Sequence, residues 1–364
     1  MGTLKACRNE RGEPVMAGNA APKGRKGRVL RKVAVTLLFI LLFYIVFSTA
    51  AALVAPTLIF SRSDVGAENL EIAFSDLGLP RTEVRFESGA NELMGYYYEA
   101  EGAKGIVVFV HGFHSGADAH LPEILWFLDR GWSVFAFDGT GTRGSEGAGT
   151  VGLAQMKYDL MCALNFIETS LPAQPVVLYG HSQGAYAAAA VLNDFPEIRA
   201  AALIAGFDSP LNIMMYHARA RVGVLADTQY PFLVLSNYLT FGAEGNESAA
   251  SSINAGDTPV LIIDCARDEI VTEELRISTR GVTDPNAKVV SVDSGHSGAW
   301  LTDGAEEYAR ELEAELSELH EKYGADLPDE AIEDFRSRID YARLWELDES
   351  FMERILALYD AAVR

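Results

Sequence analysis

The stretch LYGHSQGAYAAAA, residues 178–190, places a small polar group between two apolar segments. The apolar run PVVLYGH (175–181) leads into it, and the alanine-rich residues that follow are strong helix formers. The polar group itself, GHSQG (180–184), has the form G-x-S-x-G. Between a buried strand and a helix, this pattern forms a sharp turn whose glycines leave the serine hydroxyl exposed. The stretch therefore predicts a strand, a turn that presents Ser182, and a helix.

Short apolar runs alternate with longer helical stretches on both sides of this turn. Near-continuous apolar runs are typical of strands buried on both faces, and helices between them imply a mainly parallel sheet. The first two runs indicate a hairpin. We expect strands at 82–88, 92–100, 105–112, 132–138, 175–181, 201–207, 258–264 and 287–293, with helices at about 118–130, 151–170 and 183–194. The predicted fold class is α/β, with a mainly parallel central sheet flanked by helices.

Residues 208–257 interrupt this alternation with helical pieces that carry apolar side chains. These side chains either line a lid over an apolar pocket or form the buried faces of short helices, and both interpretations stay open. They are Met214, Met215, Tyr216, Phe232, Leu233, Tyr238 and Phe241. We refer to residues 208–257 as the lid insert.

Charge is distributed unevenly along the chain. Residues 1–32 hold nine Lys or Arg and two acids, a balance of +7, whereas the whole chain carries −21. The remainder is therefore strongly acidic, and it would repel both nucleic acid and an anionic membrane surface. No nucleic-acid partner is expected.

An uncharged segment lies between Lys32 and Arg62. Its apolar part, Val33–Ala55, would be about 35 Å long as a helix, which is enough to cross a bilayer. Basic residues precede it and an acidic domain follows, so the positive-inside rule places the N-terminus in the cytoplasm and the body outside. We expect an uncleaved anchor; cleavage of a signal peptide after STAAALVA would instead give a secreted protein.

These segments give the expected domain organisation. A basic cytoplasmic tail (1–32) precedes the anchor helix (33–60) and a linker (61–81), and an α/β domain (82–325) precedes a C-terminal helical extension (326–364). Beyond residue 301 the chain is acidic and amphipathic. We expect the nearer helix to pack on the sheet, and the helix after about residue 328 to form an extra layer or a dimer surface.

The three cysteines, Cys7, Cys162 and Cys265, cannot form a disulfide framework. A Cys162–Cys265 bridge is possible in an oxidising compartment, but buried free thiols are the favoured interpretation. No group of His and Cys has the spacing of a zinc site, and we expect neither a metal nor a cofactor.

A serine hydroxyl is a weak nucleophile and needs a histidine base that a carboxylate orients. In turns of this form, the acid and then the histidine follow the serine along the chain. Among the later histidines, His296 lies in a Gly/Ser loop directly after a strand, whereas His217 lies in the lid insert and His320 in an acidic helix. His296 is the expected base.

The orienting acid should follow the strand at 258–264. Asp268 is favoured because it lies in the loop, where a side chain can reach across the strand ends. Asp264 lies at the strand terminus, Glu269 is placed to open the next helix, and Asp293 lies only three residues before the expected base.

Hydrolysis also requires N–H groups that bind the oxyanion. The expected donors are the backbone N–H of Gln183, directly after the serine, and that of Phe113, after the strand at 105–112. His114 and His120 lie nearby, but their spacing requires neither a metal nor a base role.

The sequence resembles the α/β-hydrolase superfamily, and within it the branch of lysophospholipases, monoacylglycerol lipases and serine aminopeptidases. The resemblance rests on VVFVHGF, GHSQG, PVLIIDCARDEIV and SGHSG, which occur in the family's order over about residues 82–322. It implies an α/β-hydrolase fold with a small helical lid. It also implies a nucleophile, an acid, a base and two oxyanion donors, namely Ser182, Asp268, His296, Phe113 and Gln183.

Two departures from the family pattern affect the shape of the pocket rather than these residues. Thr140 and Arg143 stand where the glycine-rich loop of the family has Arg and Gly. Asp264 and Cys265 replace the family's His-Gly before the acid.

The expected function is that of a membrane-anchored serine hydrolase that acts outside the cytoplasm on a small-molecule or lipid-derived carboxylic ester. One alternative is a serine aminopeptidase, which needs a lid acid to hold the substrate amine; Asp227, Glu244 and Glu247 are available. A second alternative is a non-catalytic, membrane-tethered binding protein with this fold. Such a protein has no physical reason to keep a serine, an acid and a histidine together.

Overall fold

The computed structural model describes residues 25–63, 70, 74, 79–324 and 327–364 of the chain. Most of the predicted basic tail, with Cys7, and part of the predicted linker lie outside these residues. The chain divides after Ala50 into two compact units, and the second unit, Ala51–Arg364, contains the whole sheet.

The centre of the second unit is an eight-stranded sheet with the strand order β1-β2-β4-β3-β5-β6-β7-β8. The first two strands form the expected antiparallel hairpin, β2 also pairs antiparallel with β4, and the pairs from β4 to β8 are parallel. The predicted α/β class and mainly parallel sheet are therefore confirmed. The strands are β1 (Thr82–Ser88), β2 (Asn91–Tyr98), β3 (Ile106–Val110), β4 (Ser133–Phe137), β5 (Val176–His181), β6 (Ala200–Ile204), β7 (Val260–Cys265) and β8 (Ala287–Val292).

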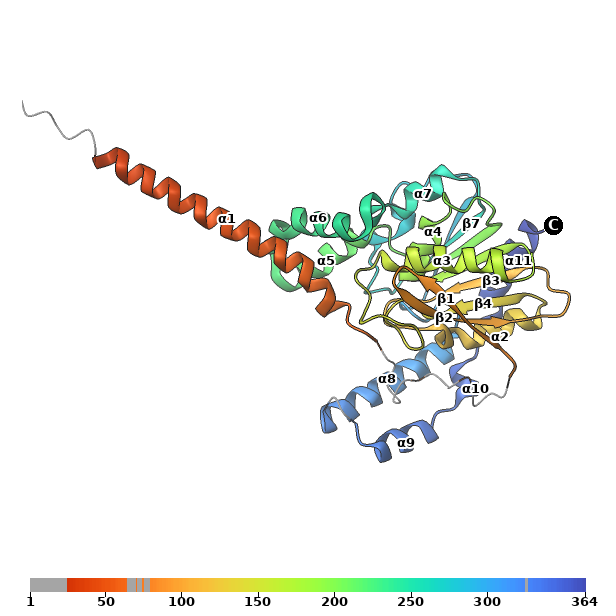
Figure 1. Cartoon of the computed structure of the whole chain (residues 1–364). Coiled ribbons are helices and arrows are strands. Elements are labelled where there is room, and N and C mark those ends of the chain that lie inside the picture. The colour runs from red at the N-terminus through yellow and green to blue at the C-terminus, as the bar shows by residue number, and fades with distance from the viewer. Residues whose placement is uncertain (1–24, 64–69, 71–73, 75–78, 325–326) are drawn as a thin grey trace, which may run out of the picture. The chain divides into compact units, whose positions relative to one another are not determined.

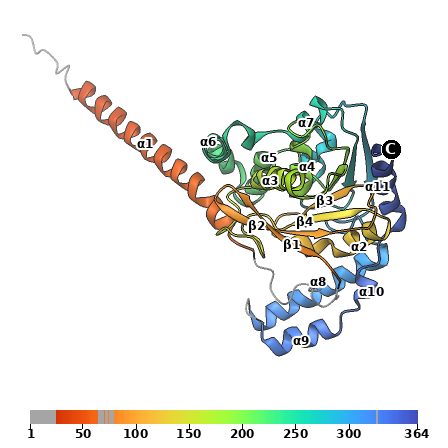
Figure 2. The same ribbon diagram turned by 45° about the vertical axis from the view of Figure 1, so that its right-hand side comes forward.

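Helices cover both faces of this sheet, as Figures 1 and 2 show. The residues of β3, β4 and β6 are all buried, because side chains of both pleat directions meet a helical layer. One apolar core contains α3 (Gln155–Ser170), α4 (Gln183–Ala190) and α7 (Ala249–Ala255). The core on the other face contains α2 (Leu121–Asp129) and α11 (Glu349–Ala362).

The C-terminal helices pack in the reverse of the expected order. The nearer helix, α8 (Asp303–Tyr323), buries apolar side chains against α9 (Asp329–Ser337) and α10 (Tyr341–Leu344) in a separate small core. The last helix, α11, packs on the sheet, and the Tyr359 hydroxyl donates to the carbonyl of Leu178 in β5 at 2.6 Å. The last helix therefore covers the sheet instead of forming the expected extra layer, whereas α9 and α10, which also follow residue 328, form the separate core with α8.

The lid insert consists of short helical pieces, as predicted: α5 (Pro210–Val222), η3 (Gly223–Gln229), α6 (Tyr230–Phe241) and η4 (Gly242–Asn246), followed by α7. The interpretation of its apolar side chains as buried helix faces holds for some of them, and others face solvent. Met215 is buried, whereas Tyr238 is 57% exposed, and Val224 (77%) and Leu225 (68%) add to an exposed apolar surface.

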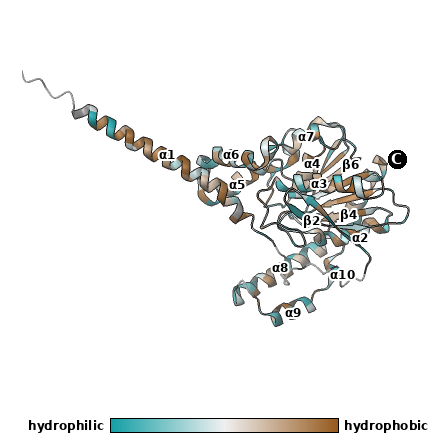
Figure 3. Cartoon of the chain, in the orientation of Figure 1, coloured by the Kyte–Doolittle hydropathy of each residue, from teal (hydrophilic) through white to brown (hydrophobic). Residues whose placement is uncertain are grey.

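The N-terminal helix α1 (Arg25–Ile59) contains one segment, Gly27–Pro56, that is long and apolar enough to cross a membrane. Figure 3 shows apolar residues along most of its length. Its large side chains are exposed, for example Leu37 (59%) and Phe43 (72%). Exposed apolar side chains of this kind are typical of a membrane-spanning helix or a signal sequence.

Candidate active site

The GHSQG turn joins β5 to α4, as predicted. Ser182 has φ 55° and ψ −114°, a conformation that a non-glycine residue adopts only where the surroundings enforce it. The two flanking glycines permit the turn sterically: a Cβ on Gly184 would lie 1.9 Å from the carbonyl oxygen of Val110, and one on Gly180 would lie 2.5 Å from that of Gly184. The turn holds Ser182 at the carboxyl end of β5, where α4 begins at Gln183.

Ser182, His296 and Asp268 are joined by two hydrogen bonds, although 114 and 28 residues separate them along the chain. Ser182 Oγ lies 2.9 Å from His296 Nε2, and His296 Nδ1 lies 2.7 Å from Asp268 Oδ2. Because the carboxylate faces Nδ1, that nitrogen carries the proton and Nε2 is free to accept one from the serine. The geometry is that of a serine hydroxyl placed to donate its proton to a histidine nitrogen.

Backbone groups hold the Asp268 carboxylate in place. Its other oxygen, Oδ1, accepts the N–H groups of Ile270 and Val271, both at 2.8 Å. The side chain is buried, so both oxygens have fixed partners and the carboxylate cannot rotate away from His296.

Two residues outside the predicted set fix the loop that carries His296. The Nε2–H of His181 donates to the carbonyl of His296 at 2.9 Å, and Glu306 Oε1 accepts the N–H of Gly295 at 2.7 Å. Burial, together with the neighbouring His296, lowers the pKa of His181 well below its ordinary value. His181 therefore stays neutral and adds no positive charge beside His296. The sequence does not predict this role for His181, apart from its place directly before Ser182 in the turn.

The other candidates for the acid and the base make different contacts or are exposed. Asp264 accepts a hydrogen bond from Ser278 at 2.6 Å, and Asp293 is paired with Arg267 at 2.9 Å. Glu269 is exposed. His217 faces the carbonyl of Ile270, and His320 faces that of Gly324.

The expected oxyanion donors lie in two turns at the carboxyl edge of the sheet. Gln183 is the first residue of α4, where backbone N–H groups point out of the helix, and its side chain donates to the carbonyl of Leu153 at 2.9 Å. Phe113 follows β3, and its ring stacks on that of His114 at a centroid distance of 3.7 Å. His114 has φ 56°, so this turn is also held in a conformation that most side chains avoid.

Short segments brace the turn that contains Phe113. His111 donates from Nδ1 to the carbonyl of Gly112 at 2.7 Å and accepts the N–H of Gly139 at Nε2 at 2.9 Å. Phe60, which directly follows α1, contacts the Phe113 ring edge-on at a centroid distance of 5.3 Å. No local sequence pattern predicts this last contact, since it joins segments about fifty residues apart.

The lid insert is tied to the rest of the domain by a buried lysine. Lys157 in α3 is 1% exposed and pairs with Glu247 at 2.7 Å, Asp194 at 3.0 Å and Glu244 at 3.2 Å. Burial alone lowers the pKa of Lys157, but hydrogen bonds and charge from the three carboxylates raise it above its ordinary value. The lysine therefore stays charged and holds η4 against α3.

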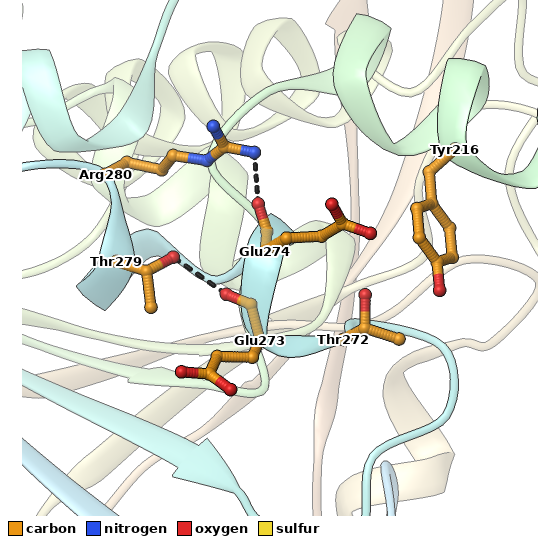
Figure 4. A pocket seen from close by; sticks show the side chains of 6 residues that line it. All are labelled: Tyr216, Thr272, Glu273, Glu274, Thr279 and Arg280. Carbon is orange, nitrogen blue, oxygen red and sulfur yellow. Dashed lines mark hydrogen bonds between the residues drawn. The ribbon is translucent and has the colours of Figure 1, made fainter.

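A surface hollow of about 480 Å³ lies between α5 and the segment that follows the Asp268 loop. Figure 4 shows the side chains that line it. Thr279 and Arg280 donate to main-chain carbonyls of Glu273 and Glu274, which fixes the floor of the hollow. The lining residues are Tyr216, Thr272, Glu273, Glu274, Thr279 and Arg280. The hollow is polar and open, unlike a site for an acyl chain.

Cys162 and Cys265 are both free thiols, so the possible bridge between them is absent. Cys265 is buried in β7, and burial raises its pKa to about 11. Buried free thiols were the favoured interpretation, although Cys162 is only half-buried.

Comparison with known proteins agrees with this fold. The profile of the serine aminopeptidase S33 family matches residues 101–237. An esterase of Pyrococcus furiosus shares 19% identity at a TM-score of 0.51 over 73% of this chain and 100% of its own. An α/β hydrolase from Vibrio vulnificus shares 16% identity at a TM-score of 0.50 over 75% of this chain and 92% of its own. No curated protein matches the sequence. The strand order, the GHSQG turn after β5 and these similarities together show that the chain has the α/β-hydrolase fold.

Proposed function

We propose that this protein is a membrane-anchored serine hydrolase that cleaves carboxylic esters through an acyl-enzyme. The observation that carries the proposal is the hydrogen-bonded series Ser182–His296–Asp268, with distances of 2.9 and 2.7 Å, on a turn of the required conformation. Three side chains from three separate loops meet in this order only if the fold is built to hold them.

The reaction follows from the positions of the protons. Ser182 Oγ attacks the ester carbonyl carbon while His296 Nε2 takes the hydroxyl proton, and the N–H groups of Phe113 and Gln183 bind the oxyanion. The tetrahedral intermediate collapses, the C–O bond to the alcohol breaks, and His296 gives its proton to the leaving oxygen. A water then attacks the acyl-Ser182 ester by the same route, which releases the carboxylic acid and restores the serine.

Two features of the lid insert support an ester rather than a peptide substrate. The carboxylates available for holding a substrate amine are already paired: Glu244 and Glu247 with Lys157, and Asp227 with Arg219 at 2.6 Å. The exposed apolar surface of the insert, which includes Val224, Leu225 and Leu239, is suited to an acyl chain or a bilayer. A lipid-derived ester is therefore the favoured substrate.

Peptide hydrolysis is the second candidate function, because the profile of the serine aminopeptidase family matches residues 101–237. For that reaction an acidic group must bind the substrate amine, and Glu274 in the hollow beside α5 is a carboxylate whose side chain faces Tyr216 (Figure 4). The same serine, base and acid serve both reactions, so substrate turnover is the discriminating observation.

Membrane anchoring is supported by the length, composition and exposed apolar side chains of Gly27–Pro56. With the basic tail on the cytoplasmic side, the catalytic domain lies outside the cytoplasm. If the segment is instead a signal peptide, the same domain is secreted.

The test compares short acyl esters with aminoacyl anilides, using the full chain in detergent. We expect a higher kcat/KM for the esters, and loss of turnover in Ser182→Ala. The control is Ser252→Ala, another buried serine that lies in α7. Clear preference for the anilides would reassign the protein as a peptidase. No turnover of either substrate by the wild type above the uncatalysed rate would favour the non-catalytic binding protein.

A further inference from the structure

The residues that follow the anchor helix, Phe60–Ser63, lie against the expected active site; we call them the exit segment. They precede the part of the chain that carries the family resemblance, and they belong to the same compact unit as the sheet. Phe60 is 3% exposed and is part of the main apolar core. The exit segment is therefore built into the hydrolase domain rather than being a loose tether.

The exit segment pairs with the glycine-rich loop at 139–149. Ser61 forms an antiparallel bridge with Gly149, and Ser63 forms a parallel bridge with Thr142. The Ser63 N–H donates to the carbonyl of Gly141 at 3.0 Å. Gly149 permits this approach, because a Cβ there would lie 2.1 Å from the Phe60 carbonyl oxygen.

The Arg62 guanidinium fastens the segment to the same loop. Its Nη1 donates to the carbonyls of Ser145 at 2.8 Å and Gly147 at 3.2 Å, and its Nη2 donates to that of Arg143. The backbone N–H of Arg62 adds a bond to the carbonyl of Ala148 at 3.0 Å. An arginine that satisfies three carbonyls of one loop fixes the shape of that loop.

The exit segment also touches the turn that carries the expected oxyanion donor. The Phe60 ring packs edge-on against Phe113, and the Ser63 hydroxyl donates to the carbonyl of His114 at 3.3 Å. The exit segment therefore contacts both Phe113 and His114, and His114 has a positive φ. If the packing of Phe60 and the hydrogen bond from Ser63 were removed, the strained backbone at His114 would be free to relax.

We propose that the exit segment is a positioning element of the active site, which holds the Phe113 N–H in the direction required to bind the oxyanion. The inference rests on the proposed serine hydrolase function. It adds that the residues directly after the apolar helix are needed for the full catalytic rate. A small rotation of one donor matters because the N–H must point at the oxygen in the transition state.

The test uses Phe60→Ala in the full chain, with a short acyl ester and a trifluoromethyl ketone that forms a tetrahedral oxyanion on serine. We expect kcat to fall about tenfold, with KM within about twofold, since part of one donor's contribution is lost. The affinity for the ketone should fall by the same factor as kcat/KM. Phe60→Leu, which keeps an apolar side chain against Phe113, should restore most of the activity.

The matched control is Phe74→Ala. Phe74 is another buried phenylalanine between α1 and β1, but it packs on Tyr98 at 5.6 Å and on Arg81. We expect this variant to lose thermal stability while its kcat and its ketone affinity stay near those of wild type. If Phe60→Ala does not fold, Arg62→Ala replaces it, because Arg62 is exposed. The kcat and the ketone affinity are then measured for that variant.

The inference is overturned if Phe60→Ala keeps its kcat, or if its kcat falls while its ketone affinity stays unchanged. It is also overturned if Phe74→Ala shows the same losses. Failure of the proposed function gives a different result, because then the wild-type chain would show neither ester turnover nor ketone binding.

Discussion

At the scale of single residues, the expected site depends on hydrogen bonds that fix which histidine nitrogen carries a proton. His296 can accept the serine proton only if its Nδ1 proton is held by Asp268, whose second oxygen is occupied by two backbone N–H groups. Two further buried histidines near these residues, His111 and His181, have lowered pKa values because of burial. They serve as neutral hydrogen-bond donors and acceptors.

Asp268 is the expected acid, and its contacts differ from those of its rivals, since it alone among them contacts His296. Asp268→Asn keeps the size of the side chain but removes the charge that stabilises the imidazolium, so kcat should fall by about 10³–10⁴. Asp264→Asn is the matched control, because Asp264 lies in the same segment and contacts Ser278 instead. Its kcat on a short ester should stay within a few-fold of wild type. Similar losses in both variants would refute this assignment.

Stability against acid should depend on His111. Burial lowers its pKa to about 4, whereas an unfolded histidine titrates near 6.5, so the unfolded state takes up the proton first as pH falls. Its contribution is therefore complete above pH 6.5 and is lost as pH falls toward 4. Protonation of Nε2 also breaks its bond to Gly139.

The measurement is the free energy of unfolding by urea at pH 7 and pH 5. We expect a fall for wild type that is smaller in His111→Gln, since glutamine does not titrate. An equal fall in the two proteins would show that His111 is not the titrating group.

At the scale of elements, the lid insert is held by charge as well as by apolar contact. Lys157 in α3 reaches Glu244 and Glu247 at the end of the insert and Asp194 after α4. The lysine side chain is buried, whereas the three carboxylates are 25–51% exposed. Removing the cation therefore leaves partly solvated carboxylates close together, without a counter-charge.

Lys157→Met should lower the free energy of unfolding by about 2 kcal/mol, which is less than for fully buried pairs because water reaches the carboxylates. The control is Lys104→Met, which removes the 3.0 Å pair with Asp360 at a more exposed position. It should cost less than about 1 kcal/mol. Urea unfolding measures both, and equal costs would contradict the role given to Lys157.

Elements with a strong local pattern were predictable, and those set by distant contacts were not. The apolar runs of β3 to β7 and the glycines around Ser182 identified the strands and the turn directly. The exit segment carries no local signal, because its bridges to Gly149 and Thr142 join parts of the chain about eighty residues apart. The packing of α11 on the sheet is predictable from its apolar pattern. Its buried residues recur at helical spacing: Phe351, Met352, Ile355, Leu356 and Tyr359.

At the scale of the whole molecule, the exit segment links two properties that the sequence presents separately, an apolar N-terminal helix and a serine site. Gly27–Pro56 has the length of a membrane span, and the residues after it are part of the hydrolase domain. Release of the domain by cleavage within STAAALVA would leave the exit segment in place, since it begins at Phe60.

The state of the N-terminus is measured by the intact mass of the protein in the membrane fraction. We expect a mass that includes the apolar helix, because the basic tail before it is longer than that of a usual signal peptide. A new N-terminus at residues 52–56, together with protein in the soluble fraction, would show that the segment is a signal peptide.

The central claim, that Ser182 is a nucleophile activated by His296, is tested most directly with a fluorophosphonate probe. This reagent forms a covalent bond with a serine only when a base activates the hydroxyl. We predict that the full-length protein is labelled on the peptide that contains Ser182, and that labelling is lost in Ser182→Ala and strongly reduced in His296→Ala. An unlabelled wild-type protein, or labelling that persists in Ser182→Ala, would contradict the account.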